Sequence, residues 1–189
     1  MNLHEYQGKE LLSRYGVKIQ RGIVAQNVEE AVDAYHKITA QSGSPIAIVK
    51  AQLHAGGRGK GGGVKVAKNL EDLKLHASNI IGMMLKTPQT PGGMEGPGKL
   101  VRQVLIAEDS YVPAFDQCKE FYMSVLTDRA RQCNVIIYST EGGMEAPISK
   151  GVVVTPRQPS GGRGGSGPKG GQATVPGLMS MAGLSMTII

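Results

Sequence analysis

The sequence of 189 residues is poor in aromatic residues, cysteine and histidine, and these shortages exclude several classes of protein. It has no tryptophan, and its two cysteines, Cys118 and Cys133, form no CxxC motif. The four histidines form neither an HxH nor an HExxH pattern. A structural zinc site and a disulfide framework are therefore not expected. We expect free thiols in a reducing, cytoplasmic compartment.

Long apolar runs are also missing. No apolar stretch reaches the roughly 18 residues that a membrane-spanning helix needs. The N-terminal segment carries Glu5 and Glu10, whereas a secretory signal has a charged head followed by an apolar core. The sequence thus predicts a soluble protein that is not exported and has no membrane partner.

Acidic residues are absent from the C-terminal part of the chain. The last carboxylate is Glu145, whereas residues 146–189 still carry four basic residues. The net charge of +6 is concentrated there, since residues 1–145 hold 17 basic and 15 acidic residues. That balance is ordinary and does not favour nucleic acid as a partner.

The composition changes abruptly after residue 145. Residues 151–189 contain ten glycines, four prolines and no aromatic residue. Such a segment buries too little apolar surface to offset its chain entropy, so we predict disorder. A reading-frame error is the favoured explanation; a genuine disordered tail and an RGG-type RNA arm are the alternatives. We expect a domain at 1–145 and a basic, Gly/Pro-rich tail at 146–189.

Hydrophobic periodicity and capping residues predict an α+β fold, in which helices alternate with strands before a hairpin-rich sheet. The expected helices are 2–15, 27–43 and 69–84, the expected strands are 17–25, 46–49, 63–67, 100–108, 120–126 and 134–138, and the exposed connection is 87–98.

The detailed pattern makes further predictions. Asn2 and Glu5 suit a capping box at the first helix, whose apolar stripe would run through Leu3, Tyr6, Leu11, Leu12 and Tyr15. The apolar strand 46–49 is expected to be buried on both faces, with Lys50 emerging at its end.

Residues 50–66, KAQLHAGGRGKGGGVKV, form a basic, glycine-rich segment between two expected strands. Glycine permits φ > 0 and lets backbone N–H groups approach a phosphate closely. Lys50, Arg58 and Lys60 supply positive charge. Because the loop itself has no carboxylate, these cations repel one another unless an anion binds. We interpret the segment as a nucleotide phosphate loop; the alternative is a flexible glycine hairpin without a ligand.

Two other kinds of phosphate loop fit less well. A Walker A loop needs Lys followed by Ser or Thr, and no window of the chain supplies it. Residues 57–62 match GxGxxG, but a dinucleotide fingerprint needs a helix directly after the loop, and a strand is expected here. The remaining interpretation is a glycine-rich hairpin that covers the nucleotide phosphates.

Three blocks of sequence, residues 1–7 (MNLHEYQ), 49–60 (VKAQLHAGGRGK) and 138–144 (YSTEGGM), resemble the β subunit of succinyl-CoA synthetase, the succinate–CoA ligase family. The resemblance extends over about residues 1–145. It implies the N-terminal portion of an ATP-grasp fold. It also implies that the intact protein forms succinyl-CoA, ADP and phosphate from succinate, CoA and ATP, through a phosphohistidine on a partner α subunit.

The resemblance also assigns nucleotide-binding residues. Lys50, Gly57, Arg58 and Gly59 match positions that contact the phosphates. The alternative for Lys50 is a lysine whose head reaches solvent from the end of a strand. His54 has no carboxylate partner in its loop and is expected to be structural or to donate to a phosphate, with no catalytic role.

Three further positions are expected to contact the nucleoside, Glu108 because it ends a predicted strand and Tyr111 and Glu120 because they match the family. Glu108 would lie beside the adenine amino group or the hinge, Tyr111 would contribute a backbone contact at the hinge, and Glu120 would approach the ribose hydroxyls. The alternative for each glutamate is a solvated strand end. The base is not determined, so the cofactors implied are ATP or GTP, together with Mg²⁺.

The match to the family ends after Met144. The family's Mg²⁺ ligands, an Asn and an Asp, and its second, flavodoxin-like domain would lie beyond the matching part. The 189-residue chain is therefore expected to be a fragment that is inactive alone. The alternatives left open are a malate–CoA ligase or ATP-citrate-lyase-type relative, and a non-catalytic fragment that binds nucleotide or the α subunit.

Overall fold

The computed structural model describes residues 3–111, 118, 120–128, 133–139 and 185–186. The chain divides into two compact units between Cys118 and Lys119, and each is described by itself. The predicted disorder of the C-terminal tail falls outside the described residues, except at Ser185–Met186.

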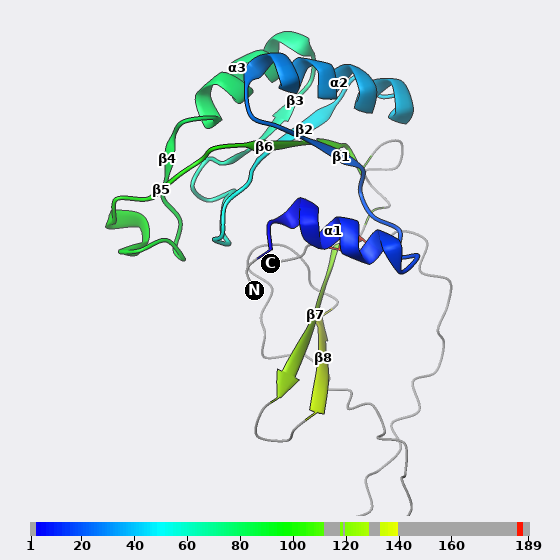
Figure 1. The fold of residues 1–189 in the computed structure, drawn as a ribbon, viewed down its shortest axis with the longest axis vertical. Coiled ribbons are helices and arrows are strands. Elements are labelled where there is room, and N and C mark those ends of the chain that lie inside the picture. Colours follow the sequence, from blue (N-terminus) through cyan, green and yellow to red (C-terminus); the bar gives the residue numbers. More distant parts are fainter. Residues whose placement is uncertain (1–2, 112–117, 119, 129–132, 140–184, 187–189) are drawn as a thin grey trace, which may run out of the picture. The chain divides into compact units, whose positions relative to one another are not determined.

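A four-stranded antiparallel sheet is the centre of the first unit (Figure 1). Its order is β1-β6-β2-β3, with β1 at Gly22–Ala25, β6 at Val104–Glu108, β2 at Ala47–Ala51 and β3 at Val64–Ala67. The β2–β3 pairing confirms the predicted glycine hairpin, because Lys50 lies opposite Val64 at its base. The sheet thus carries the glycine-rich segment at one end of β2.

Two capped helices, α2 (Val28–Ser42) and α3 (Leu70–Ile80), pack on one face of this sheet (Figure 1). The Asn27 side chain accepts a hydrogen bond from the Glu30 N–H at 2.8 Å, as the sequence predicts for an N-cap. Asn69 caps α3 in the same way, at 2.8 Å from the Asp72 nitrogen. Gly43, with φ of 70°, ends α2 in the left-handed conformation that glycine favours.

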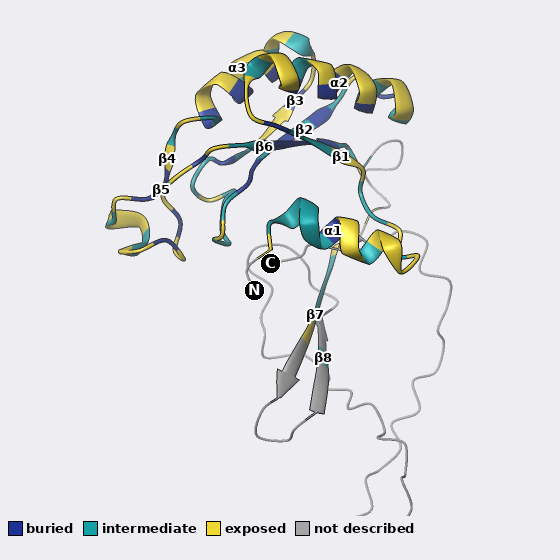
Figure 2. Ribbon diagram, in the orientation of Figure 1, coloured by how far each residue is buried: buried dark blue, intermediate teal, exposed yellow. Residues whose placement is uncertain are grey.

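The core lies between these helices and the sheet, where buried residues face one another (Figure 2). On α2 the buried residues, spaced as on one face of a helix, are Ala31, Ala34, Tyr35 and Ile38. On α3 the buried residues are Leu73, Ala77 and Ile80. In the strands, Val49 and Ile106 are fully buried.

The first helix differs from its prediction. Helix α1 spans Glu5–Arg14 with His4 as its N-cap residue, and Asn2 lies outside the described residues. The expected apolar stripe is only partly turned inward, because Tyr6 and Leu12 are half-buried whereas Leu11 is 40% and Tyr15 85% exposed. The one buried residue of α1 is Lys9. The helix packs its charged side against charged partners, and the apolar pattern therefore identifies its inner face only in part.

Two strands and one helix also differ in their bounds from the prediction. The strand expected at 17–25 is limited to β1, whose first residue is Gly22. The helix expected to reach Met84 ends at Ile80, and the strand expected at 100–108 divides at residues 101–103 into β5 and β6. The short strands β4 (Met84–Leu85) and β5 (Lys99–Leu100) pair with each other.

The sequence predicts that the connection at residues 87–98 is exposed. In the structure, this segment between β4 and β5 is partly buried. Thr87 and Thr90 are buried, and the Thr87 nitrogen donates to the Thr90 hydroxyl at 3.0 Å. A short 3₁₀ helix, η1, follows at Gly93–Glu95. Buried polar groups need such partners, and this segment supplies them internally.

In the second unit, β7 (Glu120–Asp128) and β8 (Cys133–Ser139) form the predicted antiparallel pair. The short strand β9 (Ser185–Met186) pairs with β7 in parallel. Among the helices of the described residues, none is both long and apolar enough to cross a membrane.

Candidate functional site

Strand β2 presents two different faces. Ala47, Val49 and Ala51 are buried toward α2 and α3, whereas Ile48 and Lys50 are only partly buried. Successive side chains of a strand point to opposite faces, so Lys50 lies on the face away from the two helices. The predicted burial on both faces is therefore complete on the face toward α2 and α3 and only partial on the other.

The glycine-rich loop leaves β2 and returns to β3 as a closed structure. The Ala51 nitrogen donates to the Gly63 carbonyl at 2.7 Å, and the Gly63 nitrogen donates to the Arg58 carbonyl at 2.8 Å. Gly57 and Gly62 adopt φ of 71° and 81°. These two positions require glycine because other residues are strained there.

The loop rests on the segment that joins β4 to β5. The Gly56 nitrogen donates to the Gln89 side chain at 2.7 Å, and Lys99 donates to the His54 carbonyl at 3.0 Å. A Cβ at Gly61 would collide with the Lys86 carbonyl oxygen. Some glycines of the loop therefore serve close packing against this support as well as any approach of a ligand.

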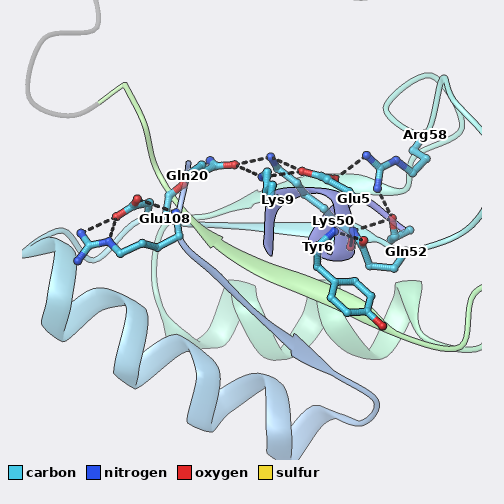
Figure 3. A network of polar contacts seen from close by, with 10 residues as sticks. Glu5, Tyr6, Lys9, Gln20, Lys50, Gln52, Arg58 and Glu108 are labelled. Carbon is cyan, nitrogen blue, oxygen red and sulfur yellow. Dashed lines mark hydrogen bonds and ion pairs between the residues drawn. The ribbon is translucent and has the colours of Figure 1, made fainter. Parts of the chain in front are cut away.

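A buried cluster of charges lies beside the loop, centred on Glu5 of α1 (Figure 3). Its Oε2 accepts from Arg58 Nη2 at 2.6 Å. Its Oε1 lies 2.7 Å from Lys9 Nζ and 3.4 Å from Lys50 Nζ. The loop itself has no carboxylate, and α1 brings one to its cations from outside the loop.

Two glutamines extend this cluster at either side. Gln20 Oε1 accepts from Lys50 Nζ at 2.7 Å and from Lys9 Nζ at 3.0 Å, and Gln20 Nε2 donates to the Glu108 carbonyl at 2.6 Å. Gln52 is buried, and its Oε1 accepts from the Tyr6 nitrogen at 3.4 Å. The glutamines join α1, the connection before β1, and the ends of β2 and β6 into one polar network.

Electrostatics of the cluster favour an ionised carboxylate. Burial alone would raise the pKa of Glu5, but Lys50, Lys9 and Arg58 lower it to about 2. Burial lowers the pKa of Lys50, and Glu5 opposes that change. The cluster thus holds one negative group among three cations in a site from which water is largely excluded.

A pair of imidazole rings lies next to the cluster. His4 and His54 stack with ring centroids 4.1 Å apart. Burial, followed by the charges of His54 and Arg58, lowers the pKa of His4. His54 thus packs on the N-cap residue of α1.

The structure brings together four of the residues predicted for the site: Lys50, Gly57, Arg58 and Gly59, all in β2 or the loop after it. Arg58 turns back toward the strand, because its Nη1 donates to the Ala51 carbonyl at 2.7 Å.

The other predicted residues have different surroundings. Glu108 ends β6, and its carboxylate binds the Arg21 guanidinium at 2.6 Å and 2.7 Å and accepts from the Arg21 nitrogen at 2.8 Å. The Tyr111 nitrogen donates to the Asp109 side chain at 2.9 Å. Glu120 begins β7 in the second unit.

Glu5, Lys9 and Gln20 are the cluster residues that the sequence reasoning missed. Their only local signal is the spacing of Glu5 and Lys9, which places both on one side of a helix. In the part of the chain that the structure describes, no group of three or more His, Cys, Asp or Glu side chains could hold a metal ion.

The family model described as the ATP-grasp domain matches residues 2–150. The chain belongs to the ATP-grasp domain family. A solved structure of the Ca. Korarchaeum cryptofilum dinucleotide-forming acetyl-coenzyme A synthetase 1, in complex with coenzyme A, Ca-AMPCP and HgCl⁺, has the same fold, with a TM-score of 0.55 at 21% identity. That likeness covers 73% of this chain and 53% of the other.

Curated relatives are more similar in sequence. The chain is 57% identical over 145 residues to the succinate–CoA ligase [ADP-forming] subunit beta of Flavobacterium johnsoniae, which is 77% of this chain and 36% of the relative. The subunit of the same name from Christiangramia forsetii is 56% identical over 145 residues, 77% of this chain and 35% of the relative. The chain thus spans about a third of the length of the curated relatives it matches.

Proposed function

We propose that this ATP-grasp chain is the nucleotide-binding part of a succinate–CoA ligase β subunit. The observation that carries the proposal is the buried excess of positive charge at the glycine-rich loop, in a chain 57% identical to a succinate–CoA ligase [ADP-forming] subunit beta. Three cations around one carboxylate suit a polyanion, and nucleotide phosphates are polyanions. The whole reaction of the relatives, including succinate and CoA, is part of the proposal.

The phosphate contacts are assigned to residues that lie together. Lys50 and Arg58 would bind phosphate oxygens through their charged heads, and Gly57 and Gly59 would let the loop backbone come close. Arg58 can donate up to five hydrogen bonds, and within the described residues it donates two. These groups would stabilise charge on the phosphoryl group during transfer.

The nucleoside contacts rest on the sequence. Glu108 would lie near the base, Tyr111 would contribute a backbone contact at the hinge, and Glu120 would approach the ribose. ATP is the proposed nucleotide, in agreement with the words "ADP-forming" in the relatives' names. Mg²⁺, when bound with ATP, would neutralise phosphate charge, and we assign it no ligand among the described residues.

The proposed partner is the α subunit of a succinate–CoA ligase, which would carry the histidine that is phosphorylated in the reaction. The relatives' designation as subunit beta supports a partner of another kind. Co-elution of the chain with the Flavobacterium johnsoniae α subunit in size-exclusion chromatography tests this pairing, and separate elution at micromolar concentrations contradicts it.

The phosphate site is tested by titration calorimetry with ATP in the presence of MgCl₂. We expect Lys50→Ala and Arg58→Ala each to weaken ATP binding about tenfold or more, the effect of losing a charged hydrogen bond. Lys74→Ala is the matched control, because Lys74 is an exposed lysine of α3 on the other side of the sheet. Its affinity for ATP should equal that of the wild type.

The two possible failures differ. Wild-type protein that folds cooperatively and binds no ATP refutes the proposed function. ATP binding that survives both Lys50→Ala and Arg58→Ala keeps nucleotide binding but places the phosphates elsewhere on the chain.

A further inference from the structure

The charge cluster draws its cations from three different elements of the fold. Lys9 comes from α1, Lys50 from β2 and Arg58 from the loop, and their only carboxylate partner among the described residues is Glu5. The Glu5 side chain is 8% exposed. Buried charges are costly unless they are paired, so the position of this one carboxylate governs how all three cations are held.

We propose that Glu5 is a positioning residue of the nucleotide site, which holds Lys50 and Arg58 in place for the phosphates. The inference rests on the proposed function and deepens it, because it assigns a role to a residue outside the glycine-rich loop. Glu5 acts through Lys50 and Arg58, and it does not itself touch the nucleotide.

The two carboxylate oxygens have separate tasks. Oε1 binds the two ammonium groups, whereas Oε2 binds the Arg58 guanidinium at 2.6 Å. A single planar group therefore fixes the distance between Lys50 in the sheet and Arg58 in the loop. The Tyr6 nitrogen, one residue further along α1, donates to Gln52 at 3.4 Å, which attaches the same turn of the helix to the end of β2.

The cations keep donors for a ligand while Glu5 holds them. Arg58 uses Nη1 for the Ala51 carbonyl and Nη2 for Glu5, and its guanidinium has five N–H donors in total. Lys50 bonds Gln20 and Glu5, and an ammonium has three donors. Phosphate oxygens can therefore be bound without breaking the contacts to Glu5.

The opposite interpretation is that Glu5 blocks the site as an internal anion that phosphate must displace. The charge balance argues against it, since one carboxylate leaves two positive charges of the cluster uncompensated. The two interpretations predict opposite changes in ATP affinity when Glu5 loses its charge, so the experiment decides between them.

The experiment compares wild type with Glu5→Gln and with Glu10→Gln, by titration calorimetry with ATP and MgCl₂ between pH 7 and pH 10. Glu10 is the matched control, because it lies on the same helix in an ion pair with Arg14 but is 61% exposed. We expect Glu5→Gln to weaken ATP binding about tenfold, while Glu10→Gln binds as the wild type does.

The pH profile separates positioning from a purely structural role. Glu5 opposes the lowering of the Lys50 pKa by burial. Without the carboxylate, Lys50 loses its proton at a lower pH. The alkaline decline of ATP affinity should therefore begin at lower pH in Glu5→Gln than in the wild type. A variant that is merely less stable but still folded would keep the wild-type profile.

Glu5→Asp covers the case in which Glu5→Gln does not fold. It keeps the charge but is one methylene shorter, so it cannot reach both the lysines and Arg58 as Glu5 does. Weaker ATP binding by folded Glu5→Asp supports the proposal, whereas wild-type affinity overturns it. Unchanged or tighter ATP binding by Glu5→Gln also overturns the positioning role of Glu5, while the proposed function stands. A wild type that binds no ATP overturns both the positioning role and the proposed function.

Discussion

Acid should weaken the fold through Glu5, and the structure sets the size of the effect. The ordinary pKa of this carboxyl group is 4.5, and the three neighbouring cations lower it to about 2 in the folded protein despite burial. A group whose pKa is lowered by folding contributes stability above its unfolded pKa and loses it as the pH falls toward its folded pKa. The relevant window therefore runs from about pH 4.5 down to about pH 2.

The magnitude follows from the width of that window. Each pH unit between the two pKa values is worth about 1.4 kcal/mol, so ionised Glu5 contributes about 3 kcal/mol to the free energy of unfolding at neutral pH. At pH 2.5 about 1 kcal/mol of that contribution remains. This is a large share of the roughly 5–15 kcal/mol that stabilises an ordinary domain.

The assay is urea denaturation of the wild type, Glu5→Gln and Glu10→Gln at several pH values from 7 to 2.5. The free energies of wild type and Glu5→Gln should differ by about 3 kcal/mol at pH 7 and converge toward about 1 kcal/mol at pH 2.5. Glu10 forms an exposed pair with Arg14, so Glu10→Gln should stay within about 0.5 kcal/mol of the wild type throughout. A difference between wild type and Glu5→Gln that does not change with pH would refute the reasoning.

Two substitutions, Leu73→Ala and Gly61→Ala, test the packing, and Leu75→Ala is the control for the first. Leu73→Ala should lower the free energy of unfolding by about 2–5 kcal/mol, because Leu73 is fully buried between α3 and the sheet. Leu75→Ala, at an exposed position of the same helix, should change it by less than about 0.5 kcal/mol, and equal effects in chemical denaturation would contradict the assigned core. Gly61→Ala should cost about 1–3 kcal/mol, because the added Cβ meets the Lys86 carbonyl oxygen. A denaturation midpoint equal to that of the wild type would show that the loop does not rest on this support.

Features that depend on a few consecutive residues could be predicted from the sequence. Asn27, Asn69 and Gly43 mark helix ends because each acts on backbone groups within one turn. The spacing of apolar residues in α2 identifies its buried face for the same reason, since neighbours along a helix face are fixed by its period. The β2–β3 hairpin follows from strand patterns on either side of the glycines.

The predictions failed where a segment packs against something other than the apolar core. Helix α1 has an apolar pattern, yet Tyr15 is exposed and Lys9 is buried. The period of a helix shows which residues share a face, but it cannot show what that face meets. The strand expected at 100–108 divides for a related reason. The residues of β5 pair with β4, and the chain joins the four-stranded sheet only at β6.

The sequence by itself determined the family, the capped helices and the glycine-rich loop with Lys50 and Arg58. Only the tertiary structure decided that Glu5 supplies the anion for those cations. Glu5 is 45 residues from Lys50 and 53 from Arg58 in the chain, and they meet because α1 covers the face of β2 opposite the core. Local interactions fix helices and turns, whereas an ion pair across such a separation depends on how the completed elements pack.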